Sequence, residues 1–136
     1  YSDEDAGKRE ADYNEIRLAE IYYSLAECKF KANDVDGAAK LLNAVRKRNY
    51  PQDTWAEYLY KPEGTVTLTQ DELYDEWGRE FLAEGRRRTD LIRWGLYCTE
   101  EWWDKKPDAD SHWDIFPIPR DMMGADHTLK QNPGYN

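Results

Sequence analysis

Apolar residues recur at steps of three and four between Tyr13 and Ala32, with charged and polar residues between them. This period is typical of an amphipathic α-helix with a wide apolar face. The residues expected on that face are Ile16, Leu18, Ala19, Ile21, Tyr22, Leu25, Ala26 and Phe30. Asn33 is expected to end the helix, because Asn tolerates the left-handed conformation that often follows the last helical turn.

A second amphipathic helix is predicted from Asp34 to about Arg48. Asp34 is suited to cap it, since a carboxylate accepts hydrogen bonds from the first backbone N–H groups of a helix. The inward-facing residues are expected to be Ala38, Ala39, Leu41, Leu42 and Val45. The break between the two helices is two to three residues long, which favours antiparallel packing. The pair resembles a tetratricopeptide-type hairpin, in which small residues let two helices approach closely.

The same pattern returns 52 residues further along the chain. The shift pairs Tyr22 with Tyr74, Leu25 with Trp77, Ala26 with Gly78, Asn33 with Gly85, Leu42 with Trp94 and Val45 with Tyr97. Thr69-Gln70-Asp71-Glu72 is typical of a capping box that opens a third helix, and Gly85 is expected to end that helix. A fourth helix is expected from about Thr89 to Trp103, after an insertion at residues 51–68. Asp90 stands where the first hairpin has Ala38, so we expect the two helices of the second hairpin to be held together partly by charged side chains.

The segment around Gly85 alternates acidic and basic residues at the three- and four-residue spacing of helix neighbours. We expect a structural ion-pair network made of Glu80, Glu84, Arg87, Asp90 and Arg93. Paired carboxylates are also the catalytic groups of glycosidases, but the neighbouring arginines favour the ionised form of both. A hydrolase would need two facing carboxylates free of arginine. The sequence has no nucleophile elbow or phosphate-binding loop, so no enzyme activity is predicted.

The last part of the chain changes character. Lys105–Asp114 is typical of a polar loop, and Ile115-Phe116-Pro117-Ile118-Pro119 cannot be helical because each proline disfavours a helix. An Asn132-Pro133-Gly134 turn comes near the end. An extended tail, with Ile115, Phe116 and Ile118 as its apolar residues, is expected to lie across the helices. The predicted fold is therefore all-α: tetratricopeptide-like helical hairpins with an irregular loop and an extended C-terminal tail packed on them.

Acidic residues outnumber basic ones, with 28 Asp and Glu against 19 Lys and Arg and a formal net charge of −9. Electrostatic binding of nucleic acid needs a broad basic face, so no nucleic-acid partner is predicted. No apolar run approaches the length of a membrane span. Cys28 and Cys98 are expected to be two mostly buried thiols. Spacing alone neither establishes nor excludes a disulfide between them.

The stretch Asp108–Asp114 superficially imitates a calcium-binding loop. However, Trp113 stands where the glycine of the sharp turn is needed, and Pro119 stands at the position of the bidentate glutamate. The chain has two His and two Cys, without the spacing of zinc ligands. No metal and no cofactor is therefore predicted.

Three sequence motifs follow one another along the chain. They are Arg17-Leu18-Ala19-Glu20-Ile21-Tyr22 with Leu42-Asn43-Ala44-Val45-Arg46, then Glu80-Phe81 through Glu84-Gly85 to Arg93-Trp94-Gly95, and finally Pro117-Ile118-Pro119 with Gln131-Asn132-Pro133-Gly134-Tyr135. In this order they resemble the C-terminal region of the SusD/RagB family, surface glycan-binding lipoproteins of Bacteroidetes. Trp77, Arg88 and Asp126-His127 depart from the residues usual in that family and indicate a divergent member. The resemblance implies a charged N-terminal segment at residues 1–12 and a SusD-like C-terminal helical domain at residues 13–136 of a protein several times longer.

The resemblance also implies a function. It is sugar capture at the extracellular face of the outer membrane, without catalysis, and delivery of oligosaccharide to a SusC-like TonB-dependent transporter. Contact with the membrane would be only through a lipid anchor absent from this chain. Sugar capture uses exposed aromatic rings, and the candidates are Trp55, Tyr58, Tyr60, Trp102, Trp103 and Trp113, for each of which packing is the alternative role. The alternative function is a tetratricopeptide-type adaptor that binds peptides in a helical groove.

Overall fold

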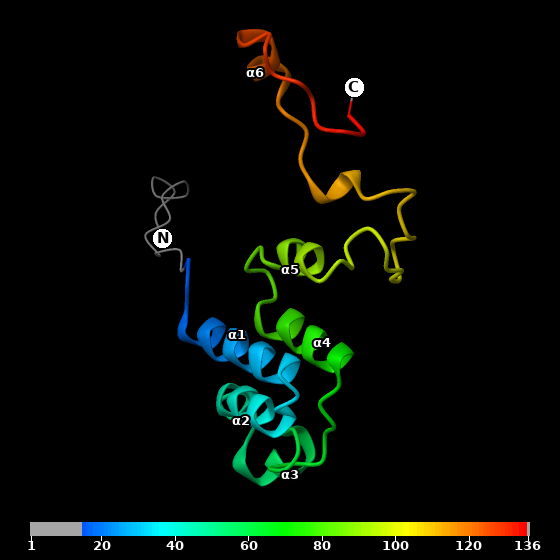
Figure 1. Cartoon of the computed structure of the whole chain (residues 1–136). Helices are drawn as coiled ribbons and strands as arrows, with labels where there is room; N and C mark the ends of the chain where they lie inside the picture. Colours follow the sequence, from blue (N-terminus) through cyan, green and yellow to red (C-terminus); the bar gives the residue numbers. More distant parts are fainter. Residues whose placement is uncertain (1–14, 136) are drawn as a thin grey trace, which may run out of the picture. The chain divides into compact units, whose positions relative to one another are not determined.

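The computed structural model describes residues 15–135, so the charged segment predicted at residues 1–12 lies outside the described residues. The fold is all-α, with tetratricopeptide-like hairpins. The chain divides into two compact units, one that ends at Trp77 and one that begins at Gly78. In the first unit, α1 (Leu18–Lys31) and α2 (Val35–Arg46) lie side by side, as Figure 1 shows.

The turn between α1 and α2 confirms the prediction from the sequence. Asn33 has a left-handed backbone with φ of 64°. Its N–H donates to the carbonyl of Phe30 (2.9 Å), and the N–H of Asp34 donates to the carbonyl of Lys29 (2.9 Å), which is the bond pattern of a Schellman motif. Asp34 Oδ1 then accepts from the N–H of Gly37 (2.9 Å) and caps α2.

The apolar face predicted for the first helix is partly wrong. The buried residues of α1 are Ala19, Tyr23, Ala26 and Glu27. Ile16, Leu18, Ile21 and Leu25 of the predicted face are exposed instead, and Leu18 is 70% exposed at the rim of a groove between α1 and α2. The reason is that α2 and α4 cover the side that carries the two small alanines and Tyr23. The outer apolar residues therefore stay uncovered among the described residues of this unit.

A buried polar network joins helices that are far apart in sequence. Arg46 of α2 forms an ion pair with Glu76 of α4, and both side chains are buried. Tyr23 donates to the other oxygen of Glu76 (2.8 Å) and packs edge-on against Trp77, with ring centroids 5.5 Å apart. Because a buried charge is costly without its partner, this pair fixes which faces of α1, α2 and α4 meet.

The insertion at residues 51–68 is more ordered than a simple loop. It contains a short 3₁₀-helix η2 (Gln52–Thr54), the helix α3 (Trp55–Tyr58) and an isolated bridge between Tyr60 and Val66. Asn43 of α2 holds it with two hydrogen bonds: its Nδ2 donates to the Tyr60 carbonyl (2.9 Å) and its Oδ1 accepts from the Tyr60 N–H (2.8 Å). The insertion is thereby fastened to the first hairpin.

The third predicted helix begins as expected but ends early. α4 (Gln70–Glu80) opens with Thr69 Oγ1 accepting from the N–H of Glu72 (3.2 Å), which confirms the cap. The prediction that Gly85 ends this helix is wrong. A turn follows Glu80, and Ala83 and Gly85 both have a left-handed backbone, with φ of 64° and 74°.

The fourth predicted helix is also shorter than expected. α5 (Arg87–Arg93) has seven residues, and the expected continuation to Trp103 is wrong. Gly95 ends it in a left-handed conformation with φ of 74°. The N–H of Gly95 donates to the Ile92 carbonyl (2.9 Å) and that of Leu96 to the Leu91 carbonyl (2.8 Å). This is the same Schellman closure that Asn33 makes after α1.

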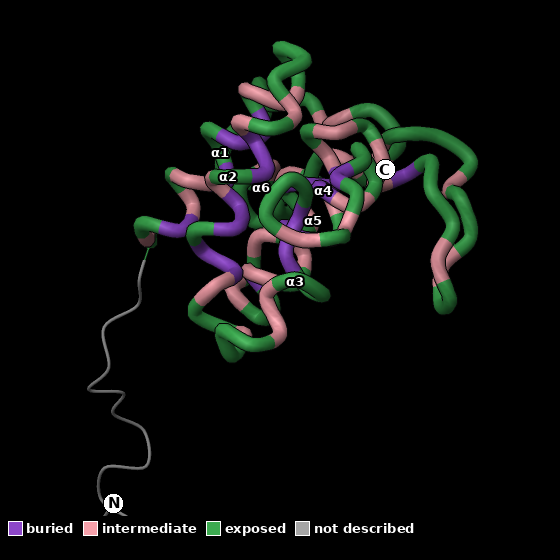
Figure 2. Tube along the Cα trace, turned by 90° about the horizontal axis from the view of Figure 1, so that it is seen from below, coloured by how far each residue is buried: buried purple, intermediate pink, exposed green. Residues whose placement is uncertain are grey.

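The second unit is irregular beyond Gly95. None of residues 99–135 is buried, and Figure 2 shows the C-terminal part of the chain mostly in the exposed and intermediate colours. The segment holds a 3₁₀-helix η3 (His112–Asp114) and the helix α6 (Arg120–Ala125), which the sequence did not predict.

Side chains of the terminal motif hold the extended segment at residues 115–119. The Gln131 amide bonds both backbone groups of Ile118, accepting from its N–H (2.7 Å) and donating to its carbonyl (2.9 Å). Tyr135 donates to the Ile115 carbonyl (2.8 Å). Arg88 links this tail to α5, because its guanidinium lies 4.0 Å from the Phe116 ring centroid. Ile115 and Phe116 themselves stay exposed.

The two cysteines differ. Both are free thiols, but Cys28 is exposed, so the expectation that it is buried is wrong. Cys98 is buried and its Sγ donates to Asp114 Oδ1 (3.3 Å). Burial, together with the Asp114 carboxylate, raises the pKa of the Cys98 thiol to about 11.

Candidate functional site

The second unit contains a cleft that brings two predicted aromatic residues together. It has a volume of about 330 Å³ and is lined by Arg87, Leu91, Trp102 and Trp103; we name it the Trp102–Trp103 cleft. Trp103 is 95% exposed. An exposed indole of this size on an irregular segment is available for contact with a ligand.

Backbone and side-chain contacts position this cleft. Trp102 and Lys105 form an isolated antiparallel bridge, in which each N–H donates to the other's carbonyl (3.0 Å). The Lys105 ammonium lies 5.0 Å from the centroid of a Trp102 ring. On the helical side, Arg87 crosses Gly78, where an added Cβ would lie 3.2 Å from Arg87 Nη1. The cleft thus combines indole rings with a guanidinium, which has five donors and no acceptor.

A second cleft in the same unit has a different chemistry. It has a volume of about 380 Å³ and is lined by Asp110, Ser111, His112, Ile115, Pro133 and Gly134; we name it the His112 cleft. Three aromatic rings pack beside it: His112 lies 4.4 Å from Trp113 and 5.1 Å from Tyr135, centroid to centroid. Trp113, another predicted aromatic residue, is 48% exposed.

Hydrogen bonds fix the polar edge of the His112 cleft. Asp110 Oδ1 accepts from the backbone N–H of His112 (2.9 Å) and also pairs with its Nδ1. These bonds hold the pKa of Asp110 below its usual value, and the bond from the backbone N–H has the larger effect. The carboxyl group therefore stays ionised at neutral pH and acts as a hydrogen-bond acceptor.

The three aromatic residues predicted in the insertion lie in the first unit. Tyr58 is exposed and stacks on Tyr50, with centroids 4.8 Å apart, and Trp55 donates to the Tyr50 carbonyl (2.9 Å). Tyr60 is fully buried and donates to Glu72 (2.8 Å). Burial raises the pKa of Tyr60 well above its usual value. Tyr60 is thus a core residue, whereas Tyr58 is exposed and Trp55 is half-buried.

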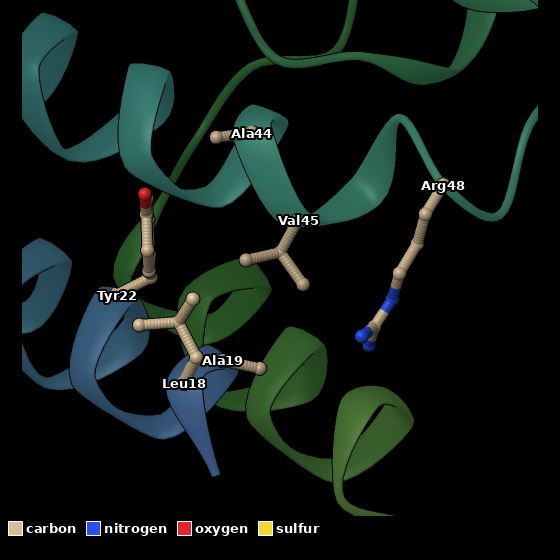
Figure 3. Close-up of a pocket in the computed structure, with 6 residues that line it drawn as sticks. All are labelled: Leu18, Ala19, Tyr22, Ala44, Val45 and Arg48. Carbon is tan, nitrogen blue, oxygen red and sulfur yellow. The ribbon is translucent and has the colours of Figure 1, made fainter.

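The first hairpin contains a third hollow, the α1–α2 groove, with a volume of about 220 Å³. Figure 3 shows side chains of α1 and α2 on its two sides, with Arg48 beyond them. Its lining residues are Leu18, Ala19, Tyr22, Ala44, Val45 and Arg48. Such a mainly apolar lining is suited to an apolar side chain rather than to a group rich in hydroxyls.

An ion pair at the predicted spacing lies in the charged segment around α5. Asp90 is buried, and its Oδ1 accepts from Arg93 Nε (2.8 Å). The wider network with Glu80, Glu84 and Arg87 stays a prediction. Asp90 lies at the position that matches the small Ala38 of the first hairpin, and its charge is paired with that of Arg93.

Nowhere in residues 15–135 do three or more His, Cys, Asp or Glu residues gather in a way that would hold a metal ion. None of the helices in the same range has both the length and the apolar composition needed to cross a membrane.

Several residues that line the clefts are not predicted as site residues from the sequence. Arg87 is expected in an ion-pair network, and no binding role is predicted for Leu91, Ser111 or His112. The spacing of Asp110 and His112, two residues apart, is the local signal that was available, because an Asp often accepts from the backbone two residues on.

Comparisons with known proteins agree with the motif resemblance. A sequence model of the SusD family matches residues 2–112. The starch-binding protein SusD of Bacteroides thetaiotaomicron is 37% identical over 132 residues, which cover 88% of this chain and 21% of that protein. A SusD-like protein of Formosa agariphila is 36% identical over 82 residues, covering 60% of this chain and 15% of that protein.

A solved structure supports the fold. The crystal structure of a SusD-like protein from Bacteroides fragilis matches with a TM-score of 0.60 at 24% identity, over 88% of this chain and 25% of that chain. The chain therefore spans a quarter or less of the length of each of these proteins.

Proposed function

This chain belongs to the SusD family, and on that premise we propose that it is the C-terminal helical domain of a cell-surface glycan-binding lipoprotein of the outer membrane. It binds an oligosaccharide or polysaccharide and does not cleave it. The longer protein delivers the sugar to a SusC-like TonB-dependent transporter and is held at the membrane by a lipid anchor. The relative named as a starch-binding protein supports this choice of ligand class.

The single observation that carries the proposal for this chain is the Trp102–Trp103 cleft. The apolar face of a sugar ring packs on an exposed indole, as other apolar surfaces do. The Arg87 guanidinium at the same cleft donates hydrogen bonds to sugar hydroxyls. Aromatic walls with a few well-placed polar groups are the usual composition of small-ligand sites.

The other aromatic candidates have smaller parts in this proposal. In the first unit the Tyr58 ring is exposed and the Trp55 ring is half-buried. Tyr60 supports the insertion from inside and does not contact the ligand, because its side chain is fully buried.

A tetratricopeptide-type adaptor remains the second candidate function, and the α1–α2 groove favours it. Its lining is suited to an apolar side chain of a peptide. An adaptor function would make peptide binding sensitive to Val45 and insensitive to Trp103.

The test is a glycan array with the 136-residue chain, followed by calorimetry with maltoheptaose and with each oligosaccharide that the array selects. Trp102→Ala and Trp103→Ala are each expected to weaken binding about tenfold, because each removes one ring contact with the sugar and the apolar area that this contact buries. Tyr22→Ala, at the α1–α2 groove of the first unit, is the matched aromatic control. Affinity that survives both cleft variants would remove the site from this cleft, and a chain that binds peptides but no glycan would replace the function.

The transporter partnership has its own test. Co-purification of the intact lipoprotein from outer membranes is expected to recover a TonB-dependent transporter. Recovery of the lipoprotein without any such transporter would contradict this part of the proposal only.

A further inference from the structure

We propose that the His112 cleft is a second carbohydrate-binding site, distinct from the Trp102–Trp103 cleft. This inference rests on the proposed function, since it takes the same class of ligand. The two clefts lie in the same unit of the chain and share no lining residue.

The size and composition of the His112 cleft fit a sugar unit. Its volume of about 380 Å³ exceeds that of the Trp102–Trp103 cleft. Asp110, Ser111 and His112 supply a carboxylate, a hydroxyl and an imidazole along one edge, and Ile115 and Pro133 supply apolar surface. Neighbouring hydroxyls of a pyranose match such an edge, because each hydroxyl both donates and accepts.

The polar groups are held in place without any ligand. Asp110 Oδ1 bonds the backbone N–H and Nδ1 of His112, which sets the orientation of the imidazole and leaves Oδ2 outside both bonds. The ring of His112 lies against Gly134, where an added Cβ would come within 2.5 Å of the His112 side chain. A site that is ordered in advance loses less conformational entropy when a ligand binds.

The aromatic rings that pack against His112 at the edge of the cleft are also anchored. Arg88 Nη2 donates to the Trp113 carbonyl (2.6 Å), so a helix residue fixes the backbone that carries this indole. The Tyr135 ring packs edge-on against both His112 and Trp113. Trp113 nevertheless remains 48% exposed and presents part of its ring to solvent.

Electrostatics favour a neutral or hydroxyl-rich ligand over an anionic one. Asp110 is ionised at neutral pH, as an aspartate of ordinary pKa is, and the hydrogen bonds from His112 lower its pKa further. An ionised carboxylate accepts strong hydrogen bonds from hydroxyl groups and repels carboxylates and sulfates. The ligand class assigned to this cleft is therefore a neutral oligosaccharide.

The experiment uses the 136-residue chain labelled with ¹⁵N and titrated with maltoheptaose and laminariheptaose, followed by the indole N–H resonances. The Trp113 signal is assigned with Trp113→Phe. With at least one of the two sugars we expect saturable shifts of the Trp113 indole. Asp110→Asn is expected to weaken the affinity measured from the Trp113 shifts about tenfold, because it removes one charge-assisted hydrogen bond. Asp121→Asn, an exposed acid of α6, is the matched control and is expected to change nothing.

The possible outcomes separate this inference from the proposed function. Shifts at Trp102 and Trp103 without any at Trp113 would overturn the second site and leave the proposed function standing. Shifts at Trp113 that Asp110→Asn weakens would support it, even if the Trp102–Trp103 cleft did not respond. Shifts at Trp113 that are equal in Asp110→Asn and Asp121→Asn would overturn the assigned site chemistry. No response at any indole to either sugar would overturn this inference, and the glycan array then decides the proposed function separately.

Discussion

The helices α2 and α5 occupy matching places in the sequence repeat but are built differently. α2 has 12 residues, a side-chain cap from Asp34 and the small buried Ala38. α5 has seven residues, no side-chain cap and the buried Asp90 at the position that matches Ala38. α2 packs against α1 in the first hairpin, whereas α5 ends early at Gly95. The segment after Gly95 lines the His112 cleft and, together with Arg87 and Leu91 of α5, the Trp102–Trp103 cleft. The more irregular copy of the repeat therefore carries the candidate sites.

Exchanging the two matching residues is expected to break this comparison most strongly. Ala38→Asp places an unpaired carboxylate in a fully buried position, and we expect it to lower the free energy of unfolding by at least about 4 kcal/mol. The reciprocal Asp90→Ala removes one partner of an ion pair with the part-exposed Arg93 and is expected to cost about 2 kcal/mol. Urea unfolding followed by circular dichroism measures both. Equal losses would mean that the two helices are built alike.

Chemical labelling of the two cysteines tests how each of the two units is packed, and it requires no substitution in the chain. At pH 8, iodoacetamide is expected to label the exposed Cys28 on the order of a hundredfold faster than Cys98, because the thiolate is the reactive form. Burial and Asp114 raise the Cys98 pKa to about 11, so its labelling is expected to rise steeply between pH 9 and about 11.

Mass spectrometry of peptides from the labelled chain gives the two rates, and urea-unfolded protein is the control in which they converge. Similar rates in the native chain would show that the segment around Cys98 is open rather than packed.

The two Schellman closures sharpen the comparison further. Gly95→Ala introduces a Cβ at φ of 74° with no neighbouring atom within 4 Å, so only backbone strain acts, and we expect a loss of about 1 kcal/mol. Asn33→Gly relieves the milder strain of Asn at φ of 64° and is expected to be neutral or to stabilise by less than about 1 kcal/mol. Thermal unfolding measures both, and a neutral Gly95→Ala would contradict the left-handed end of α5.

The smallest expected effect concerns the cap that α2 has and α5 lacks. The hydrogen bond from Lys29 and the N–H of Gly37 hold the pKa of Asp34 below its usual value of 3.8. The folded pKa is thus lower than the unfolded one, so the cap stabilises fully above about pH 4, and the stabilisation is lost as the pH falls through the folded pKa.

Asp34→Asn keeps a capping oxygen and removes this titration. Below pH 4, the melting temperature of this variant is expected to fall less steeply with decreasing pH than that of the wild type. Identical slopes would show that Asp34 is not coupled to folding.

Local signals were predictable from the sequence, and contacts between distant residues were not. Asn33, Asp34 and Thr69 act within a few residues of themselves, and their turn and caps were expected. The pairing of Tyr23 and Arg46 with Glu76 depends on residues 53 and 30 positions apart, so no periodicity reveals it. The stop at Gly95 was missed because the apolar pattern continues past it to Trp103.

The candidate sites follow the same rule. The aromatic residues of the clefts were recognised by type, but not which of them gather. Trp102 and Trp103 share a cleft because α5 ends early and brings Arg87 and Leu91 beside them. Tyr60, by contrast, is buried and accepts hydrogen bonds from Asn43 and Arg46. The residues next to Tyr60 in the sequence do not indicate this burial.

The most direct test of the account is amide hydrogen exchange of the 136-residue chain with and without the oligosaccharide that the array selects. Binding is expected to slow exchange in residues 87–113, which include Arg87, Trp102 and Trp103, and to leave exchange in α1 and α2 unchanged. Protection confined to residues 18–48 would contradict it and would place the ligand in the α1–α2 groove.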